Sequence, residues 1–117
     1  MSDKNIIIVG KIVKYIDKIQ NYTGDTTRSE FLENIMLIEV CIFNLLQIGE
    51  LAGHLGEDFR DAHPSIPWVQ IRGMRNKIAH DYEGMNINLV SQTIYEDLSA
   101  LKEQLQEILN TNKTQPK

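Results

Sequence analysis

A chain of 117 residues is long enough for one compact domain and too short for two. Its hydrophobic content of 42% and charged content of 24% are those of an ordinary folded domain and exclude a largely disordered chain. The formal net charge of −4 argues against a protein that binds nucleic acid over its whole surface, although a local basic patch is compatible with it.

The N-terminal part of the chain predicts a helix over Asn5–Asn21, because apolar residues recur there at steps of three and four. Residues 23–26 (Thr-Gly-Asp-Thr) interrupt this pattern. Thr27 and Glu30 then have the spacing of a capping box, which predicts the start of a second helix. This second helix is expected to run as one long element over Arg28–Leu55, with a glycine directly after it as its stop.

The second predicted helix is apolar on more than one face. Its apolar positions are Phe31, Leu32, Ile35, Met36, Ile38, Ile42, Phe43, Leu45 and Leu46. Such a helix is expected to lie at the centre of a bundle, or to face a partner subunit as well as its own core. The glycines at its end, such as Gly49, indicate close helix packing. A short extra helical turn is expected near residues 57–62.

Pro67 predicts the start of a third helix, which should end before Gly84. A fourth helix is predicted over Asn88–Leu109, where the apolar stripe comprises Ile94, Leu98, Leu101, Leu105 and Ile108. No alternating strand pattern is present in the sequence. The predicted fold is therefore all-α, an antiparallel four-helix bundle that forms one domain over residues 1–109, followed by a disordered C-terminal tail over residues 110–117.

No segment is expected to enter a membrane or to act as a targeting signal. The most apolar stretch, Ile35 to Leu46, is interrupted by Glu39 and Asn44 and is shorter than the ~20 residues that a bilayer requires. Cys41 is the only cysteine, so no internal disulfide can form, and a buried thiol in a reducing compartment is its expected role. We therefore expect a cytoplasmic protein.

Arg75 interrupts the apolar face of the third predicted helix. At 100° per residue, this face comprises Trp68, Ile71, Arg75, Ile78 and Tyr82. A guanidinium stays charged at neutral pH, and burying it without a partner costs several kcal/mol. Two interpretations are open. Arg75 forms an ion pair with a carboxylate of the second helix, with Glu50 or Glu39 as candidates, or it lies at a groove and grips a phosphate with its planar donors.

Asn76 and His80 lie four residues apart and therefore share a second face of the same helix. Histidine titrates near neutral pH, and an amide one turn away can orient it for proton transfer. An ordinary surface or capping histidine is the alternative. On an ideal helix His80 lies about 140° around from Arg75, which is awkward for two groups that serve one phosphate. Three explanations are open: the helix unwinds before His80, the arginine reaches round, or a second subunit completes the site.

Tyr82 follows this histidine and is either a modification site or a core aromatic that ends the apolar face. A local basic patch, compatible with brief contact with RNA, comprises Arg72, Arg75, Lys77 and His80.

His54 and His63 do not combine with His80 at any familiar metal-ligand spacing, and the chain has no CxxC or HExxH pattern. The sequence therefore predicts neither a metal site nor another cofactor.

Residues 73–82 (GMRNKIAHDY) resemble the Arg-Asn-x-x-x-His-x-Tyr signature of the HepT-like proteins, which belong to the HEPN superfamily. The resemblance extends back through residues 63–68 (HPSIPW) and 48–50 (IGE), and forward through residues 95–98 (YEDL). It covers roughly Phe31 to Leu109. An arginine followed five residues later by a histidine is a weak signal alone, but the Pro-Trp lead-in and the trailing tyrosine make the match specific.

The resemblance implies a helical bundle that forms a homodimer in which two motifs face one cleft. It also implies a metal-independent endoribonuclease that acts as the toxin of a type II toxin-antitoxin system, with RNA rather than DNA as its substrate. By that similarity, Arg75, Asn76 and His80 are catalytic. The implied partner is a nucleotidyltransferase antitoxin of the MntA type, which blocks the toxin by attaching AMP to Tyr82 (AMPylation).

These residue types suit RNA, because RNA carries its own nucleophile in the 2′-hydroxyl group. The protein then supplies proton transfer through His80 and charge stabilisation through Arg75, while Asn76 orients the histidine or binds a phosphate oxygen. The expected products are a 2′,3′-cyclic phosphate or 3′-phosphate and a 5′-hydroxyl. Two alternatives stay open: a non-catalytic helical partner that presents substrate to a nucleotidyltransferase or restrains it, and a structural dimer in which Arg75 pairs with a carboxylate.

Overall fold

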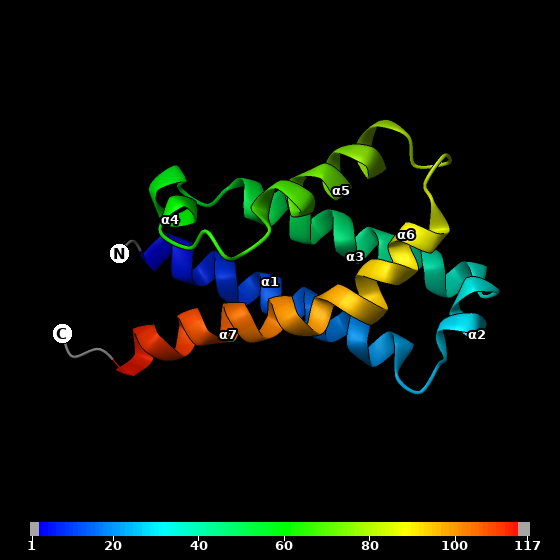
Figure 1. Cartoon of the computed structure of the whole chain (residues 1–117), viewed down its shortest axis with the longest axis horizontal. Helices are drawn as coiled ribbons and strands as arrows, with labels where there is room; N and C mark the ends of the chain where they lie inside the picture. Colours follow the sequence, from blue (N-terminus) through cyan, green and yellow to red (C-terminus); the bar gives the residue numbers. More distant parts are fainter. Residues whose placement is uncertain (1–2, 115–117) are drawn as a thin grey trace.

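The computed structural model of the chain describes residues 3–114, and every regular element in that range is a helix. The elements in chain order are α1 (Asp3–Thr23), α2 (Arg28–Leu32), α3 (Ile35–Gly53), α4 (Glu57–Asp61), α5 (Trp68–His80), α6 (Ile87–Gln92), the π-helical turn η1 (Thr93–Asp97) and α7 (Leu98–Thr114). Successive long helices run in opposite directions, and α1 packs against α3 and α7 while α3 packs against α5 (Figure 1). The predicted all-α fold is confirmed.

The core lies between α1, α3 and the helix formed by α6, η1 and α7. On α1 the buried residues recur at helical spacing, with Val9, Ile12, Ile16 and Ile19 at 1% exposure or less. On the last helix all the predicted stripe residues are buried, namely Ile94, Leu98, Leu101, Leu105 and Ile108. Burial of each such side chain contributes about 1.5–3 kcal/mol to folding, which explains why their spacing in the sequence identifies these helices.

The expectation of one long helix over Arg28–Leu55 is wrong, because two residues separate α2 from α3. Asn34 is the N-cap of α3, and its side chain accepts a hydrogen bond of 3.1 Å from the backbone N–H of Leu37. An asparagine side chain offers the backbone this alternative to a continuing helix. The predicted capping box before α2 is confirmed, since the side chains of Thr27 and Glu30 each accept from the other residue's backbone N–H.

Contacts across the bundle hold the break between α2 and α3 in place. Phe31 on α2 is fully buried, and its ring meets the ring of Tyr95 edge-on with centroids 5.8 Å apart. The Tyr95 hydroxyl donates a 2.8 Å hydrogen bond to the backbone carbonyl of Thr26. These contacts involve η1, which is distant in the sequence, and a local helical pattern therefore does not reveal them.

The short turn expected near residues 57–62 is present as α4, and α5 begins directly after Pro67. The indole N–H of Trp68 donates to the backbone carbonyls of Arg60 and His63, at 3.2 and 3.1 Å. These bonds connect the start of α5 to α4 and to the loop that follows it. They fix where α5 enters the bundle, and α5 carries the candidate site.

The last helix differs from the prediction at both its middle and its end. It contains the π-helical turn η1, where the backbone N–H of Leu98 donates to the carbonyl of Thr93, five residues earlier. It also continues to Thr114, so that residues 110–114 are helical and not part of a tail. The rest of the predicted tail, residues 115–117, lies outside the described residues.

The helix α3 is long and apolar enough, by length and composition, to cross a membrane. This differs from the expectation that its apolar stretch is too short. Core helices of soluble proteins can also be this long and apolar, and α3 packs against α1 and α5. It also exposes a stripe of apolar side chains, with Ile35 at 71% exposure, Met36 at 78%, Val40 at 41% and Phe43 at 57%.

Candidate functional site

The helix α5 carries three of the four predicted site residues, and it stays regular through His80. The chain leaves the helix at Asp81, whose backbone N–H still donates to the carbonyl of Lys77 at 2.9 Å. One explanation for the angular separation of Arg75 and His80 was that the helix unwinds before the histidine. The regular helix shows that this explanation is wrong.

Arg75 forms an ion pair with Glu50 of α3, with its Nε atom donating to Oε1 of the carboxylate. The predicted pairing with a carboxylate of the preceding helix is therefore confirmed, and of the two candidates Glu50 is the partner. The Nη1 group of Arg75 also donates to Oδ1 of Asn76 at 3.2 Å. A guanidinium has five N–H donors, so these two contacts leave others for a phosphate. The side chain is one-third exposed, which keeps it within reach of a ligand.

Gly49 allows α5 to approach α3 at Arg75. A Cβ atom at position 49 would overlap the Cβ of Arg75 and lie 2.9 Å from its Cγ, and it would also lie 3.3 Å from the backbone oxygen of Ile71. The expected role of this glycine in close helix packing is confirmed. Because Glu50 is the next residue on α3, the same close crossing places its carboxylate beside the guanidinium.

His80 and Asn76 line the same open pocket, which has a volume of about 510 Å³ and lies between the end of α5 and the start of α6. The remaining lining residues are Lys77, Asp81, Gly84, Met85, Asn86 and Leu89. Arg75 is not among them. Within one chain, Asn76 therefore connects the two other predicted residues, since it lines the histidine's pocket and accepts a hydrogen bond from the arginine.

The wall of this pocket opposite α5 is a loop held by two side-chain caps. The carboxylate of Asp81 accepts a 3.0 Å hydrogen bond from the backbone N–H of Gly84. Asn86 caps α6 by accepting from the backbone N–H groups of Asn88 and Leu89, at 3.0 and 3.3 Å. Such turns order a loop locally and so preserve the shape of the pocket beside His80. Sequence reasoning did not identify this wall, although an Asp followed three residues later by Gly is a turn signal.

Tyr82 lies just past the end of α5 and is 43% exposed, so the interpretation as a core aromatic is wrong. Partial desolvation and the carboxylate of Glu39 raise the pKa of its hydroxyl above its usual value. Glu39 lies on α3, four residues after Ile35 and next to Val40. The end of α5 and the exposed apolar stripe of α3 therefore lie next to each other on the molecule.

The predicted basic patch is only partly basic, because Glu50 neutralises Arg75. Among the described residues, no group of three or more His, Cys, Asp or Glu side chains is placed to hold a metal ion. The candidate site therefore consists of a histidine, an amide and an ion-paired guanidinium. These groups can transfer a proton, orient a substrate oxygen and stabilise negative charge.

Comparison with known proteins shows what this chain resembles. A family model described as "Ribonuclease HepT-like" matches residues 12–108. A protein of Caldanaerobacter subterraneus subsp. tengcongensis named "Putative RNase TTE0752" is 34% identical over 84 residues, which are 72% of this chain and 75% of the relative. A protein of Thermococcus cleftensis named "Probable ribonuclease HepT" is 32% identical over 91 residues, covering 78% of this chain and 83% of the relative.

A third relative, from Methanocaldococcus jannaschii and named "Putative RNase MJ0125", is 32% identical over 98 residues, which are 84% of each chain. No solved structure gives a significant match. The matched segments cover most of the chain.

Proposed function

The chain belongs to the ribonuclease HepT-like family, and from this premise we propose that it is a metal-independent endoribonuclease whose catalytic residues are Arg75, Asn76 and His80. The observation that carries the proposal is the shared position of Asn76. This residue lines an open pocket with His80 and accepts a hydrogen bond from the guanidinium of Arg75. A proton-transfer group and a cation thus meet around one amide.

The proposed reaction is an attack by the RNA 2′-hydroxyl on the adjacent phosphorus. The O2′–P bond forms, the P–O5′ bond breaks, and His80 accepts the proton of the 2′-hydroxyl. A protonated histidine then donates a proton to the departing 5′-oxygen. The products are a 2′,3′-cyclic phosphate and a 5′-hydroxyl. Proton transfer of this kind contributes about 10²–10⁴-fold to the rate, and Arg75 stabilises the charge that develops on the phosphoryl oxygens.

The proposed active form is a homodimer that pairs through α3. Met36, Val40 and Phe43 are exposed at steps of four and three, so they form one stripe on this helix. A continuous exposed apolar surface of this kind is typical of an interface. Because the carboxylate of Glu39 on α3 is close enough to raise the pKa of Tyr82, the end of α5 lies beside the stripe. Pairing of two such stripes would bring the two candidate sites toward each other.

The proposed biological role is that of the toxin in a type II toxin-antitoxin system of the cytoplasm, with an MntA-type nucleotidyltransferase as antitoxin. The antitoxin is proposed to modify Tyr82. In this step the phenolic oxygen attacks the α-phosphorus of ATP, a P–O bond forms, and pyrophosphate leaves. The exposure of Tyr82 supports the proposal, because an enzyme must reach the hydroxyl.

Cleavage of a labelled RNA by the purified protein tests the nuclease proposal. His80→Ala is expected to lower kcat by about 10²–10⁴-fold. The matched control is His54→Ala, because His54 is also exposed and at the end of a helix, and it lies outside the candidate site. Activity should persist in EDTA and give a 2′,3′-cyclic phosphate end. Equal activity of the His80 and His54 variants would exclude His80 as a catalytic residue.

The dimer and the modification have separate tests. Phe43→Glu should shift the mass measured by light scattering toward the monomer, whereas Val69→Glu, which replaces an apolar side chain that is 81% exposed on α5, should not.

Incubation with the nucleotidyltransferase and ATP should add AMP to the intact mass. That addition should disappear in Tyr82→Phe and persist in Tyr22→Phe, since Tyr22 is exposed to a similar degree at 48%.

One observation favours a second candidate function, a non-catalytic partner of a nucleotidyltransferase. The ion pair with Glu50 satisfies the charge of Arg75 without any substrate, as a purely structural arginine requires. The two functions differ in the RNA assay. A non-catalytic partner would leave RNA intact in the wild type and in both histidine variants, yet it would still bind the nucleotidyltransferase.

A further inference from the structure

The bundle is open on the side where α5 faces α7. In Figure 1, α5 diverges from α7 along its length, although both helices pack against other members of the bundle. A cavity of about 450 Å³ lies between the two helices. Cavities of this size hold small organic ligands. The cavity does not contain Asn76 or His80, so it is separate from the candidate catalytic pocket.

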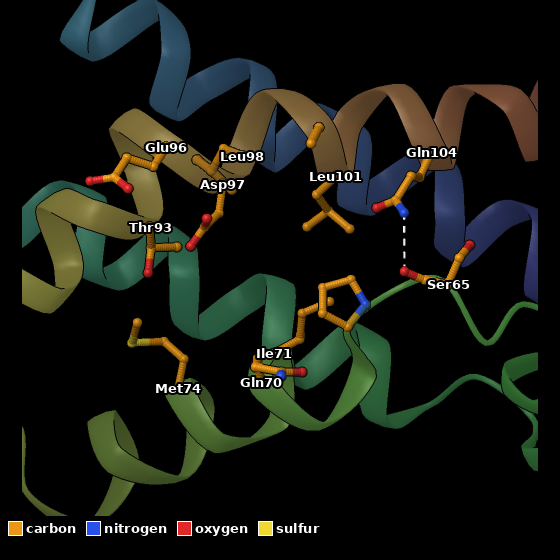
Figure 2. Close-up of a pocket in the computed structure, with 12 residues that line it drawn as sticks. Ser65, Gln70, Ile71, Met74, Thr93, Glu96, Asp97, Leu98, Leu101 and Gln104 are labelled. Carbon is orange, nitrogen blue, oxygen red and sulfur yellow. Dashed lines mark hydrogen bonds between the residues drawn. The ribbon is translucent and has the colours of Figure 1, made fainter.

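The interior of this cavity, which we call the α5–α7 pocket, is mainly apolar. Ile71 and Met74 line it from α5, and Leu98 and Leu101 line it from α7 (Figure 2). Ala100 of α7 also lines it. One end is closed by a hydrogen bond of 3.1 Å, in which the side-chain amide of Gln104 donates to the backbone carbonyl of Ser65. The apolar surface favours a ligand with a hydrocarbon or aromatic body.

A carboxylate without a partner lies at the other end of the α5–α7 pocket. Glu96 forms an ion pair of 2.5 Å with Arg28 and is thereby neutralised. The neighbouring Asp97 also lines the pocket, and Figure 2 shows its carboxylate on the same side as Thr93 and Met74. Within residues 3–114, no hydrogen bond or ion pair engages the side chain of Asp97. The pocket therefore has a free negative charge at one end.

Asp97 is the last residue of the π-helical turn η1. An extra residue in the turn from Thr93 to Asp97 rotates the following residues relative to a regular helix. Ile94 within this turn and Leu98 directly after it are buried in the core. Single π-turns inside α-helices occur frequently at functional sites. Here the turn contains a carboxylate that lines a cavity, while the core stripe stays buried.

We propose that the α5–α7 pocket binds a small organic cation, with its apolar body against Met74, Ile71 and Leu101 and its ammonium or guanidinium group on the Asp97 carboxylate. The charge at one end and the apolar surface along the rest match a ligand of this class. Such a ligand would connect α5 to α7. It would therefore raise the unfolding temperature in proportion to the logarithm of its concentration.

Phenylbutylamine is a suitable probe, because it combines an aromatic body with a primary ammonium group. In ¹H–¹⁵N spectra of the full chain we expect saturable shifts confined to residues 65–74 and 93–104, with a Kd of about 1 mM. The uncharged phenylbutanol should bind roughly threefold more weakly, and the anion phenylbutyrate should show no saturable binding. Shifts spread over the whole surface, or equal binding of the amine and the carboxylate, would overturn the proposal.

Two variants locate the site. Asp97→Asn should weaken phenylbutylamine binding roughly threefold and leave phenylbutanol binding unchanged, since it removes only the charge. Glu103→Gln is the matched control, because it removes a charge from an exposed position of α7 outside the pocket. Ala100→Phe should fill the cavity and abolish binding of both probes. Unchanged amine affinity in Asp97→Asn, or undiminished binding in Ala100→Phe, would rule out this pocket.

Discussion

Replacement of Gly49 by alanine tests the close crossing of α3 and α5. The new Cβ would overlap the Cβ of Arg75 and lie 2.9 Å from its Cγ, so the backbones of the two helices must separate. Overpacking of this kind costs about 1–3 kcal/mol. Alanine is also the better helix former by about 1 kcal/mol, which offsets part of the cost. The net change in the free energy of unfolding is therefore smaller than the steric cost itself.

Gly73→Ala isolates that steric cost. Gly73 lies in the interior of α5, and a Cβ at this position would have no atom within 4 Å. This variant should gain about 0.5–1 kcal/mol from helix propensity alone. The difference between the two variants should then be the steric term, about 1–3 kcal/mol in urea unfolding.

The rate of RNA cleavage gives a second measure of the displacement that Gly49→Ala causes. Because the displaced atoms belong to Arg75, Gly49→Ala should also lower kcat for RNA cleavage, by up to about 10²-fold for a displacement near 1 Å. Gly73→Ala should leave kcat unchanged. If Gly49→Ala proved as stable and as active as Gly73→Ala, the described approach of α5 to α3 would be incorrect.

Three further predictions concern other residues. Asn34→Ala should lower the free energy of unfolding by about 1 kcal/mol, measured in urea, because α3 loses its N-cap bond. Burial raises the pKa of the Cys41 thiol to about 11, so the native protein should not react with a thiol reagent at pH 8 and should react once unfolded in urea. The pKa of Tyr82 is raised by desolvation and by Glu39. The folded state therefore holds this phenolic proton more tightly, and stability should fall as the pH rises above about 10. In Glu39→Gln, an NMR titration of the Tyr82 ring should give a lower pKa, closer to 10.

The helices could be predicted from the sequence where a buried stripe or a local cap determines them. The stripe from Ile94 to Ile108 and the capping box at Thr27 are patterns within one segment, and both are present in the structure. The break before Asn34 could not be predicted in the same way. The surrounding residues continue a helical pattern, whereas the burial of Phe31 depends on Tyr95, which comes 64 residues later in the chain.

The candidate site shows the same division between local and non-local information. The spacing of Arg75 predicts that it interrupts the apolar face of its helix and therefore needs either a carboxylate partner or a groove, and the structure contains the carboxylate partner. The choice of Glu50 over Glu39 depends on where α3 and α5 cross, which Gly49 sets. The turn η1 is a further case, because the stripe continues through it unchanged and the sequence gives no sign of the extra residue.

The separation of Arg75 from the His80 pocket within one chain leads to a test of the proposed dimer site. Suppose that each active site combines Arg75 of one subunit with His80 of the other. Arg75→Ala and His80→Ala are then each inactive alone, but a mixed dimer contains one site with both native residues. Random exchange of equal amounts gives about one-half mixed dimers, each with one intact site of two, so activity should recover to about one-quarter of wild type. Sites built within a single chain would stay inactive after exchange, and that result would exclude a composite site between subunits.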